Sequence, residues 1–309
     1  MTIKKNYSFS IILCTYEPNE VFFQEQIESI INQTYKNWKL FIFDDSKSKK
    51  CKLLIDKLKI KNIIFYFKGP HRTFSHNFLN GLKNKSVKND LYVFADQDDI
   101  WFDSKLEYIN KFFNTVDNSA PVLYCGRTIY VNSNNSKLLN LSPLFNKKPS
   151  LKNALVQSLA GGNTMCMNNS LRDRVNQFED VDIFSHDWWF YIVNELSSGT
   201  TYYDESPLIL YRQHNNSLIG GNVGFMPQIR RLALVLNGTY KLWNDKHWKT
   251  LNKNRKIISP DKICVLEEFN HIRSCFFPIN YFFLNKYKFY RQRIIGHLGI
   301  IIALIFSKF

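Results

Sequence analysis

The sequence predicts an α/β protein built on an open, largely parallel sheet. Two observations support this prediction: apolar stretches of strand length, and segments of helical periodicity between them. The apolar stretches span residues 9–14, 38–43, 63–67 and 91–95. They are continuous rather than alternating, which is typical of strands buried on both faces. Ligands of such sheets bind at the carboxyl ends of the strands.

The gaps between these strands carry helical patterns. Apolar side chains fall on one helical face in three groups, which are Phe23, Ile27, Ile30 and Ile31, then Cys51, Leu54, Ile55 and Leu58, then Phe74, Phe78 and Leu82. After the fourth strand, Ser104 and Glu107 form a capping box that predicts a further helix. The resulting alternation of strand and helix favours a parallel sheet.

The composition fits a folded protein of a reducing compartment. The chain has 309 residues, enough for one large or two ordinary domains. Hydrophobic residues make up 45% and aromatic residues 16%, which excludes a disordered chain. The six cysteines show no CxxC spacing, and no charged-then-apolar signal peptide opens the sequence. We therefore expect a cytoplasmic location, without a disulfide framework or a zinc site.

Positive charge is concentrated in the last quarter of the chain. Residues 1–227 hold 26 Lys and Arg against 22 Asp and Glu, a net charge of +4, whereas residues 228–309 hold 15 against 4, a net charge of +11. This asymmetry predicts attraction of the C-terminal segment to a polyanion, either nucleic acid or an anionic lipid surface. The alternative is a solvated helical face.

Polar side chains follow the first, second and fourth strands directly. Because the carboxyl ends of parallel strands meet at one edge of the sheet, we expect these clusters to converge. A single cluster of this kind often serves only solubility or helix capping. The three clusters are Thr15-Tyr16-Glu17, Asp44-Asp45 and Asp96-Gln97-Asp98-Asp99.

The last of these clusters is the most informative. Three carboxylates within four residues repel one another, so they need a cation, hydrogen-bond donors or open solvent nearby. Mg²⁺ or Mn²⁺ suits such hard oxygen ligands, and proteins hold it with one or two carboxylates together with substrate phosphates. The alternative is an exposed acidic turn. The sequence has neither a P-loop nor a GxGxxG motif, which argues against an ATPase or a dinucleotide-dependent dehydrogenase.

Several short motifs occur in a specific order between residues 8 and 222. They are SIILCTYE at 10–17, QTY at 33–35, FDDS at 43–46, DQDDIW at 96–101, GGNTM at 161–165, HDWW at 186–189 and YRQH at 211–214. Together they resemble the motifs of the inverting family 2 glycosyltransferases, and the later ones resemble the subgroup that includes polysaccharide rhamnosyltransferases. The resemblance implies a GT-A fold, which is a Rossmann-like nucleotide-diphospho-sugar transferase fold, with a C-terminal helical extension.

The resemblance assigns roles to single residues on the donor side. Residues implied to bind the base and ribose of a sugar nucleotide are Thr15, Tyr16, Glu17 and either Asp44 or Asp45. The stretch from Asp96 to Asp98 corresponds to the family's DXD element, with Asp98 as a ligand of Mn²⁺ or Mg²⁺ that holds the diphosphate. Residues implied near the diphosphate are Arg72, Asp96, Arg212 and His214, and His214 is the second candidate metal ligand.

On the acceptor side, Asp187 matches the position of the family's catalytic base, although the common acidic residue before it is here His186. An inverting transfer needs one carboxylate to take the proton of the attacking acceptor hydroxyl. The alternative is that Asp187 only caps a helix starting at Trp188. We expect Trp188 and Trp189 to wall the site and thereby raise the pKa of Asp187.

Residues expected to contact the acceptor saccharide are Gly162, Asn163 and Trp188. Glycines at 161 and 162, before a predicted strand at 164–168, let the backbone approach a sugar ring closely. The alternative is a tight turn.

From residue 228 onward, basic and aromatic helical segments replace the strand pattern. We therefore expect a catalytic domain at 1–227 and a helical extension at 228–309. The apolar run at 294–306 has 13 residues, whereas a transmembrane helix needs about 20. Its basic and aromatic neighbours predict a helix in the interface of an anionic membrane surface. The alternative is a helix packed on the core or on another subunit.

These expectations combine into a metal-dependent, inverting glycosyltransferase at the inner face of the cell membrane, acting on a lipid-linked or oligosaccharide acceptor in polysaccharide synthesis. The subgroup resemblance alone points to dTDP-rhamnose as the donor. Two other classes stay open: a metal-dependent phosphohydrolase or nuclease using the same carboxylates, and a nucleic-acid-binding protein using the basic tail. The tail carries no zinc-finger, RNP or helix-turn-helix pattern, so no nucleic-acid partner is expected.

Overall fold

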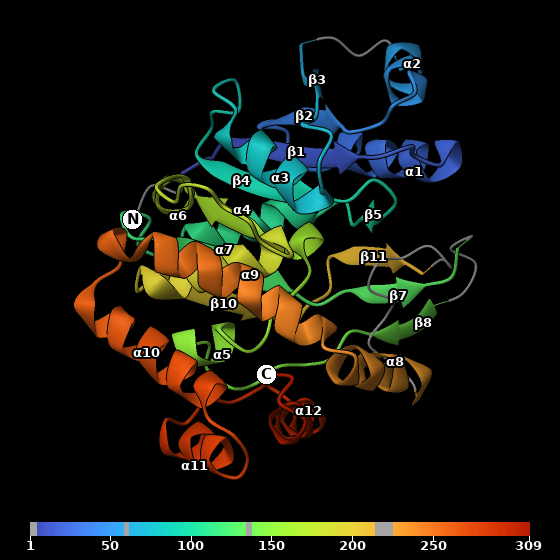
Figure 1. The fold of residues 1–309 in the computed structure, drawn as a ribbon. Coiled ribbons are helices and arrows are strands. Elements are labelled where there is room, and N and C mark those ends of the chain that lie inside the picture. The colour runs from blue at the N-terminus through green and yellow to red at the C-terminus, as the bar shows by residue number, and fades with distance from the viewer. Residues whose placement is uncertain (1–4, 59–61, 134–137, 214–224) are drawn as a thin grey trace.

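A seven-stranded sheet forms the centre of the structure, a computed structural model that describes residues 5–58, 62–133, 138–213 and 225–309 (Figure 1). The strand order is β10-β6-β9-β4-β1-β2-β3. In chain order the strands are β1 (Phe9–Thr15), β2 (Trp38–Asp44), β3 (Ile64–Lys68), β4 (Leu91–Ala95), β6 (Val122–Gly126), β9 (Cys166–Asn168) and β10 (Thr200–Asp204).

The four strands predicted from apolar stretches are confirmed as β1 to β4. β1 is buried along its whole length and pairs in parallel with β2 on one side and β4 on the other. The predicted strand at 164–168 is shorter, because residues Gly162–Thr164 form a 3-10 turn, η1, before β9. β9 runs antiparallel between β4 and β6, so the sheet is largely but not wholly parallel.

The predicted helices between the strands are also present. They are α1 (Glu20–Ile31), α2 (Lys50–Lys57), α3 (Phe74–Lys83) and α4 (Lys105–Phe113). The helix predicted after Ser104 is present as α4, but the prediction of a capping box at its start is wrong. Lys105 N bonds to Phe102 O over 3.0 Å, so the chain is already turning and Ser104 lacks the extended backbone of a capping serine. Within the described residues its side chain makes no cap hydrogen bond, and Glu107 pairs with Lys111 instead.

A second sheet of four strands stands beside the first. Its order is β5-β11-β7-β8, with β5 (Ile100–Trp101), β7 (Ile129–Val131), β8 (Leu138–Leu141) and β11 (Ile209–Arg212). β11 ends at Arg212. It pairs antiparallel with β5, which directly follows the acidic cluster, so Arg212 is brought close to that cluster.

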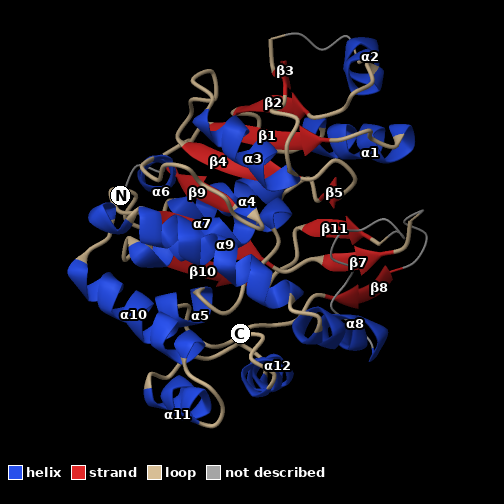
Figure 2. Cartoon of the chain, in the orientation of Figure 1, coloured by secondary structure: helices blue, strands red, loops and turns tan. Residues whose placement is uncertain are grey.

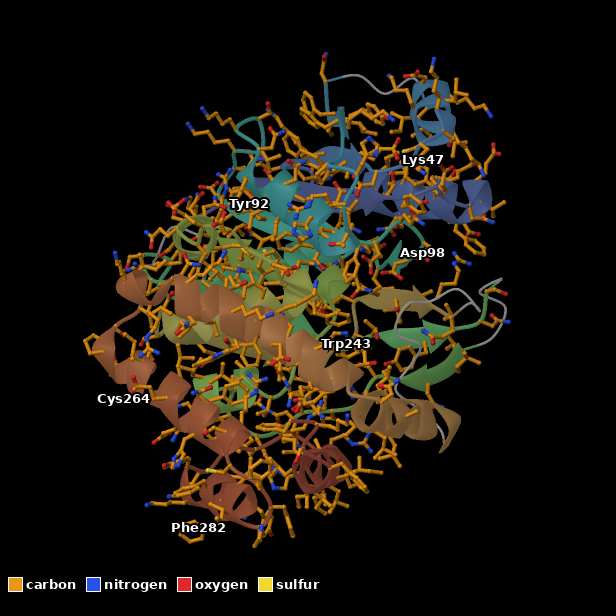
Figure 3. All side chains as sticks on the ribbon, viewed as in Figure 1. Lys47, Tyr92, Asp98, Trp243, Cys264 and Phe282 are labelled. Carbon is orange, nitrogen blue, oxygen red and sulfur yellow. The ribbon has the colours of Figure 1, made fainter. Side chains whose placement is uncertain are left out.

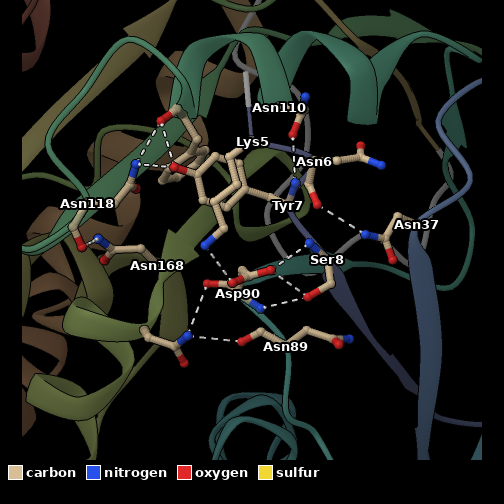
Figure 4. Close-up of polar contacts among 12 residues, drawn as sticks. Lys5, Asn6, Tyr7, Ser8, Asn37, Asn89, Asp90, Asn110, Asn118 and Asn168 are labelled. Atoms are coloured by element: carbon tan, nitrogen blue, oxygen red, sulfur yellow. Dashed lines mark hydrogen bonds and ion pairs between the residues drawn. The ribbon is translucent and has the colours of Figure 1, made fainter. Parts of the chain in front are cut away.

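Polar contacts near the N-terminus close the edge of the sheet where β1 and β4 begin (Figure 4). Asp90 Oδ2 accepts hydrogen bonds from Ser8 N at 2.8 Å and from Ser8 Oγ at 2.7 Å. Asn118 Nδ2 donates to the Tyr7 hydroxyl at 2.9 Å, and Asn168 Nδ2 donates to Asn118 O at 3.2 Å. These contacts tie the amino ends of the strands together and leave the carboxyl ends for function.

Figure 2 shows α7 (His186–Leu196) and α9 (Thr239–Lys253) in front of the sheet. The remaining helices are α5 (Leu151–Ala154), α6 (Asn169–Asn176), α8 (Phe225–Leu236), η2 (Arg255–Ile257), α10 (Pro260–Ser274), α11 (Ile279–Lys286) and α12 (Ile294–Ile305). All six cysteines are free. No helix among the described residues combines the length and apolar character needed to cross a membrane.

The C-terminal helices share a core with the rest of the molecule. The expected domain boundary after residue 227 falls inside α8. Phe269 of α10 and Leu304 of α12 belong to the same hydrophobic cluster as Phe190 of α7 and Phe94 of β4. Within the described residues, the extension expected at 228–309 is therefore packed on the catalytic part rather than built around a core of its own.

Candidate active site

The parallel register brings the carboxyl ends of β1, β2 and β4 to one edge. Thr15 pairs with Asp44 across β1 and β2, and Leu13 pairs with Ala95 across β1 and β4. The acidic cluster follows Ala95 directly. The three polar clusters therefore converge, as expected for the ligand-binding edge of such a sheet.

Asp44 is buried behind this edge. Its Oδ1 accepts hydrogen bonds from Thr15 Oγ1 at 3.0 Å and from Ser46 N at 2.9 Å. Its Oδ2 accepts one from the Tyr66 hydroxyl at 2.7 Å, and the pKa of Tyr66 is raised by burial and by this bond to Asp44. The side chain of Asp44 is fully buried. It therefore positions the ends of β1, β2 and β3 from the inside.

Tyr16 is an exposed residue of the first cluster, with 60% of its surface accessible. Its backbone is held from both sides by the Gln97 amide, which accepts from Tyr16 N at 2.9 Å and donates to Tyr16 O at 3.3 Å. Glu17 has a positive φ of 41°. Its carboxylate accepts from Ser48 Oγ at 2.7 Å and from Ser48 N at 3.0 Å, and these bonds lower its pKa. Glu17 thus ties two loops together.

Asp45 lies against the loop after β3. Its Oδ1 accepts a hydrogen bond from His71 N at 2.9 Å. A Cβ atom at Gly69 would stand 2.1 Å from the same oxygen and 2.7 Å from Asn77 Oδ1, so the loop requires glycine there. Arg72 follows His71 and is exposed. Burial lowers the pKa of His76, and the charge of Arg72 lowers it to a smaller extent.

The acidic cluster and Asp187 share one electrostatic environment. Burial, followed by the charges of Asp98 and Asp187, raises the pKa of Asp96 to about 7. The hydroxyl of Tyr211, on β11, also senses Asp96, Asp99 and Asp98, and its pKa is raised by burial and by these charges. Figure 3 places Asp98 beside the second sheet, at the edge described above.

Asp99 is fully buried and linked to the acceptor-side turn. Asn163 Nδ2 donates to Asp99 Oδ2 at 2.6 Å. Lys105, the first residue of α4, donates from Nζ to Asn163 O at 2.8 Å and stands 3.4 Å from the centre of the Trp101 ring. Burial lowers the pKa of Lys105 and raises that of Asp99. Lys105 and Asp99 together fix the position of Asn163.

Arg212 is almost fully buried, with 1% of its surface exposed. Its Nε donates to Asp98 O at 2.9 Å, and its Nη1 donates to Ser133 O at 2.6 Å. Its Nη2 is hydrogen-bonded to the Glu25 carboxylate. The sequence placed the guanidinium beside the diphosphate. The structure instead directs it to backbone carbonyls and Glu25, so it supports the acidic loop.

Asp187 lies in the first turn of α7, whose N-cap residue is Ser185 rather than Asp187 itself. The capping alternative is therefore wrong, because the helix starts at His186. Burial raises the pKa of Asp187, while hydrogen bonds from the Ser185 and Ser158 hydroxyls lower it. Its Oδ1 is buried and has no hydrogen-bond partner among the described residues.

The tryptophans after Asp187 do not wall the site. Trp188 is 5% exposed and donates from Nε1 to Ala154 O at 2.6 Å, and Trp189 is fully buried. His186 lies nearer the acceptor-side turn, since a Cβ at Gly162 would stand 2.1 Å from its Nε2. Burial lowers the pKa of His186 to about 3, so a neutral imidazole stands where an acidic residue was expected.

The residues present fit a divalent cation. Asp96 and Asp98 offer hard carboxylate oxygens, and their mutual repulsion contributes to the raised pKa of Asp96. Within the residues that the structure describes, no three His, Cys, Asp or Glu side chains are grouped to hold a metal by themselves. A cation that shares its coordination between a carboxylate and a diphosphate suits this arrangement. His214 lies outside the described residues.

Three contributors were missed by sequence reasoning. Lys105 was not singled out, because lysines are mostly exposed and no local pattern signals that this one points into the core. Gln97 stood inside the acidic cluster but had no role assigned. Glu25 lies on the amphipathic α1, and its pairing with Arg212 depends on the second sheet. All three act through partners distant in sequence.

Comparison with known proteins identifies the family. Residues 10–175 match the family described as Glycosyl transferase family 2. The dTDP-rhamnosyl transferase RfbG of Shigella flexneri is 26% identical over 240 residues, which cover 74% of this chain and 81% of that protein. An uncharacterized glycosyltransferase of Rickettsia typhi is 25% identical over 211 residues, which cover 67% of this chain but only 64% of that protein.

Two solved structures show the same fold at low sequence identity. TarS of Staphylococcus aureus in complex with UDP-GlcNAc has a TM-score of 0.51 and 15% identity, covering 81% of this chain and 73% of that one. The mannosyltransferase PcManGT of Pyrobaculum calidifontis, in complex with GDP-Man and Mn²⁺, has a TM-score of 0.54 and 11% identity. The match covers 96% of this chain and 75% of that one. With more than half of its length matched by the family and its fold in agreement, this protein belongs to glycosyl transferase family 2.

Proposed function

We propose that this family 2 enzyme is a divalent-metal-dependent, inverting glycosyltransferase with Asp187 as its base. The observation that supports this most strongly is the electrostatic coupling of Asp187 to the acidic cluster, seen in the raised pKa of Asp96. The two features come from α7 and from the end of β4. A carboxylate near the carboxylates that would hold the metal ion is placed to take the proton of the acceptor hydroxyl.

Asp187 takes the proton of the acceptor hydroxyl. As the acceptor oxygen bonds to the anomeric carbon, the bond from that carbon to the diphosphate oxygen breaks, and its electron pair leaves with the nucleoside diphosphate. Burial raises the pKa of Asp187, which makes its carboxylate a stronger base. The Ser185 and Ser158 hydroxyls partly offset this rise in pKa, and His186, whose pKa burial lowers to about 3, is too weak a base to compete for the proton.

The donor lies along the edge formed by β1, β2 and β4. The exposed ring of Tyr16 offers a surface for the nucleotide base, and Gln97 holds the backbone of Tyr16 in place. Asp98 would hold the metal ion, with His214 as the second protein ligand. When bound, Mn²⁺ or Mg²⁺ stabilises the negative charge that develops on the leaving diphosphate. Arg72 supplies a further positive charge from the loop after β3.

The donor is dTDP-rhamnose and the acceptor is a saccharide of a cell-surface polysaccharide, either lipid-linked or free. The donor assignment rests on the similarity to the rhamnosyl transferase of Shigella flexneri. Gly162 and Asn163 meet the acceptor, because η1 stands between His186 and the acidic cluster. Family membership favours a transferase over the phosphohydrolase or nuclease alternative.

Isothermal titration with a panel of nucleotides tests the donor and the metal together. The panel contains dTDP, UDP, GDP and their sugars, each with and without Mn²⁺, against the parent, Asp98→Asn and the control Asp103→Asn. Asp103 is exposed on the same segment. We expect dTDP-rhamnose to bind in the presence of Mn²⁺, and Asp98→Asn to weaken this binding by about 100-fold. Substitution of a residue that only hydrogen-bonds to a metal ligand already lowers metal affinity by about 10- to 100-fold, and Asp98 would be a ligand itself.

Two outcomes contradict the proposal separately. Equal Mn²⁺-dependent affinity in the parent and Asp98→Asn removes Asp98 from the metal site. Binding of a UDP or GDP sugar in place of dTDP-rhamnose leaves the transferase chemistry but overturns the donor.

A further inference from the structure

The C-terminal helices expose large apolar side chains to solvent. Phe276, just before α11, is 75% exposed, and Phe282 on α11 is 61% exposed. On α12, Ile294 is 79% exposed and Leu298 is 51% exposed. Side chains of this kind on soluble proteins are normally scattered singly, and a group of them marks an interaction site. We call the exposed apolar side chains of residues 276–298 the C-terminal apolar face.

The two helices that carry this face lie side by side (Figure 1). Asn280 Nδ2, at the start of α11, donates to Leu304 O of α12 at 3.3 Å. A shallow hollow on α11 is lined by Ile279, Phe282 and Lys286 among others. Figure 3 shows Phe282 at the end of the molecule and Asp98 well away from it. The face is thus separate from the candidate active site.

Charge along residues 269–309, the segment that carries the face, has one sign. Residues 269–309 contain no Asp or Glu and six basic residues, which are Arg273, Lys286, Lys288, Arg291, Arg293 and Lys308. Lys286, Lys288 and Arg293 are exposed. Aromatic and aliphatic side chains with lysines and arginines beside them are typical of segments that lie in a membrane interface.

We propose that the C-terminal apolar face docks on an anionic lipid bilayer. The apolar side chains enter the headgroup region, and Lys286, Lys288 and Arg293 meet the anionic headgroups. A second copy of the chain is a poorer occupant, because a two-fold interface would bring the same unbalanced positive charges together. A nucleic acid would match the charge but leave the apolar side chains in water.

The structure also shows why removal of residues 294–309 does not test docking. On its other side, α12 buries Ile300, Ala303 and Leu304, and Phe309 after it is buried in the same cluster. Each of the larger side chains contributes roughly 1.5–3 kcal/mol to stability. The helix is therefore both packed and exposed, and the two alternatives drawn from the sequence are not exclusive. Substitutions must be confined to the exposed side chains.

Flotation of the full-length protein with vesicles tests the proposal. The vesicles are phosphatidylcholine alone or phosphatidylcholine mixed with phosphatidylglycerol, at low and high salt. The variants are Phe276→Ser/Phe282→Ser, Ile294→Ser/Leu298→Ser, and Lys286→Gln/Lys288→Gln/Arg293→Gln. The matched control is Leu53→Ser on α2, whose side chain is 59% exposed, as much as that of Phe282. A thermal melt and gel filtration accompany each variant.

We expect the parent and the control to float with the phosphatidylglycerol vesicles and less with the neutral ones. Both serine variants are expected to lose most flotation while keeping the melt of the parent. Each positive charge removed is expected to weaken binding to the phosphatidylglycerol vesicles by about fivefold. High salt is expected to weaken this binding too, because it screens the attraction. Equal flotation of parent and serine variants, no flotation of the parent, or a parent dimer that the serine variants dissociate would overturn bilayer docking.

Discussion

Arg212 donates a hydrogen bond from Nε to the backbone carbonyl oxygen of Asp98, 2.9 Å away. The contact joins the end of β11 to the acidic loop after β4. Because the guanidinium also reaches Ser133 O and the Glu25 carboxylate, one buried side chain holds three segments. Arg212 therefore positions the acidic loop whose carboxylates we propose to serve the donor.

Arg212→Lys tests this positioning role. Lysine keeps the charge but cannot reproduce three hydrogen bonds in a fixed fork, so the acidic loop loses its support. We expect a lower melting temperature and a donor affinity that falls by about tenfold in the presence of Mn²⁺, measured by thermal melt and titration. Arg127→Lys is the control, because Arg127 bonds to Ser142 O away from the acidic loop. An unchanged melting temperature and donor affinity in Arg212→Lys would contradict the positioning role of Arg212.

Lys105→Met tests the buried link between α4 and Asn163. The substitution keeps much of the side-chain volume but leaves Asp99 without its nearby positive charge and Asn163 O without its donor. Breaking a buried charged contact on one side costs about 3–5 kcal/mol. We expect a loss of that order in the free energy of unfolding, measured by denaturant titration. Lys111→Met on the same helix removes only an exposed ion pair with Glu107, so it should cost less than about 1 kcal/mol. Equal losses in both variants would contradict the role of Lys105.

The pH dependence of transfer reports on Asp187. A base must be ionised, so kcat/KM falls as the pH drops through its pKa. Because burial raises that pKa, the acid limb should lie above the usual range of aspartate. The Ser185 hydroxyl bond lowers the pKa, so Ser185→Ala should move the limb to higher pH, whereas Ser197→Ala at the other end of α7 should not. A limb that stays in place in Ser185→Ala would contradict this assignment.

Much of the fold was predictable because its signals are local. The strands β1 to β4 are continuous apolar runs, and their register alone brings Thr15, Asp44 and Asp96 together. The second sheet was not predictable as a sheet, since β5 has two residues and β8 is exposed throughout. Without that sheet, the burial of Arg212 could not be foreseen.

The site shows the same division. The motifs singled out Asp98 and Asp187 as candidates, but the sequence could not show that Trp188 points into the core. That orientation depends on Ala154, whose carbonyl accepts the indole hydrogen bond. Lys105 was missed because its partners, Asp99 and Asn163, meet it only after β9 has been inserted between β4 and β6.

Asp187→Asn tests the mechanism most directly, by transfer and donor binding measured on the same sample. The amide is close in size to the carboxylate but cannot take a proton, and the proposed donor contacts lie on other residues. Asp182→Asn is the matched control, because Asp182 is exposed and pairs only with Lys246 among the described salt bridges. We expect Asp187→Asn to bind the donor as the parent does while its turnover falls by about 10²-fold or more, and Asp182→Asn to keep both. Turnover near that of the parent in a folded Asp187→Asn variant would contradict the assignment of Asp187 as the base.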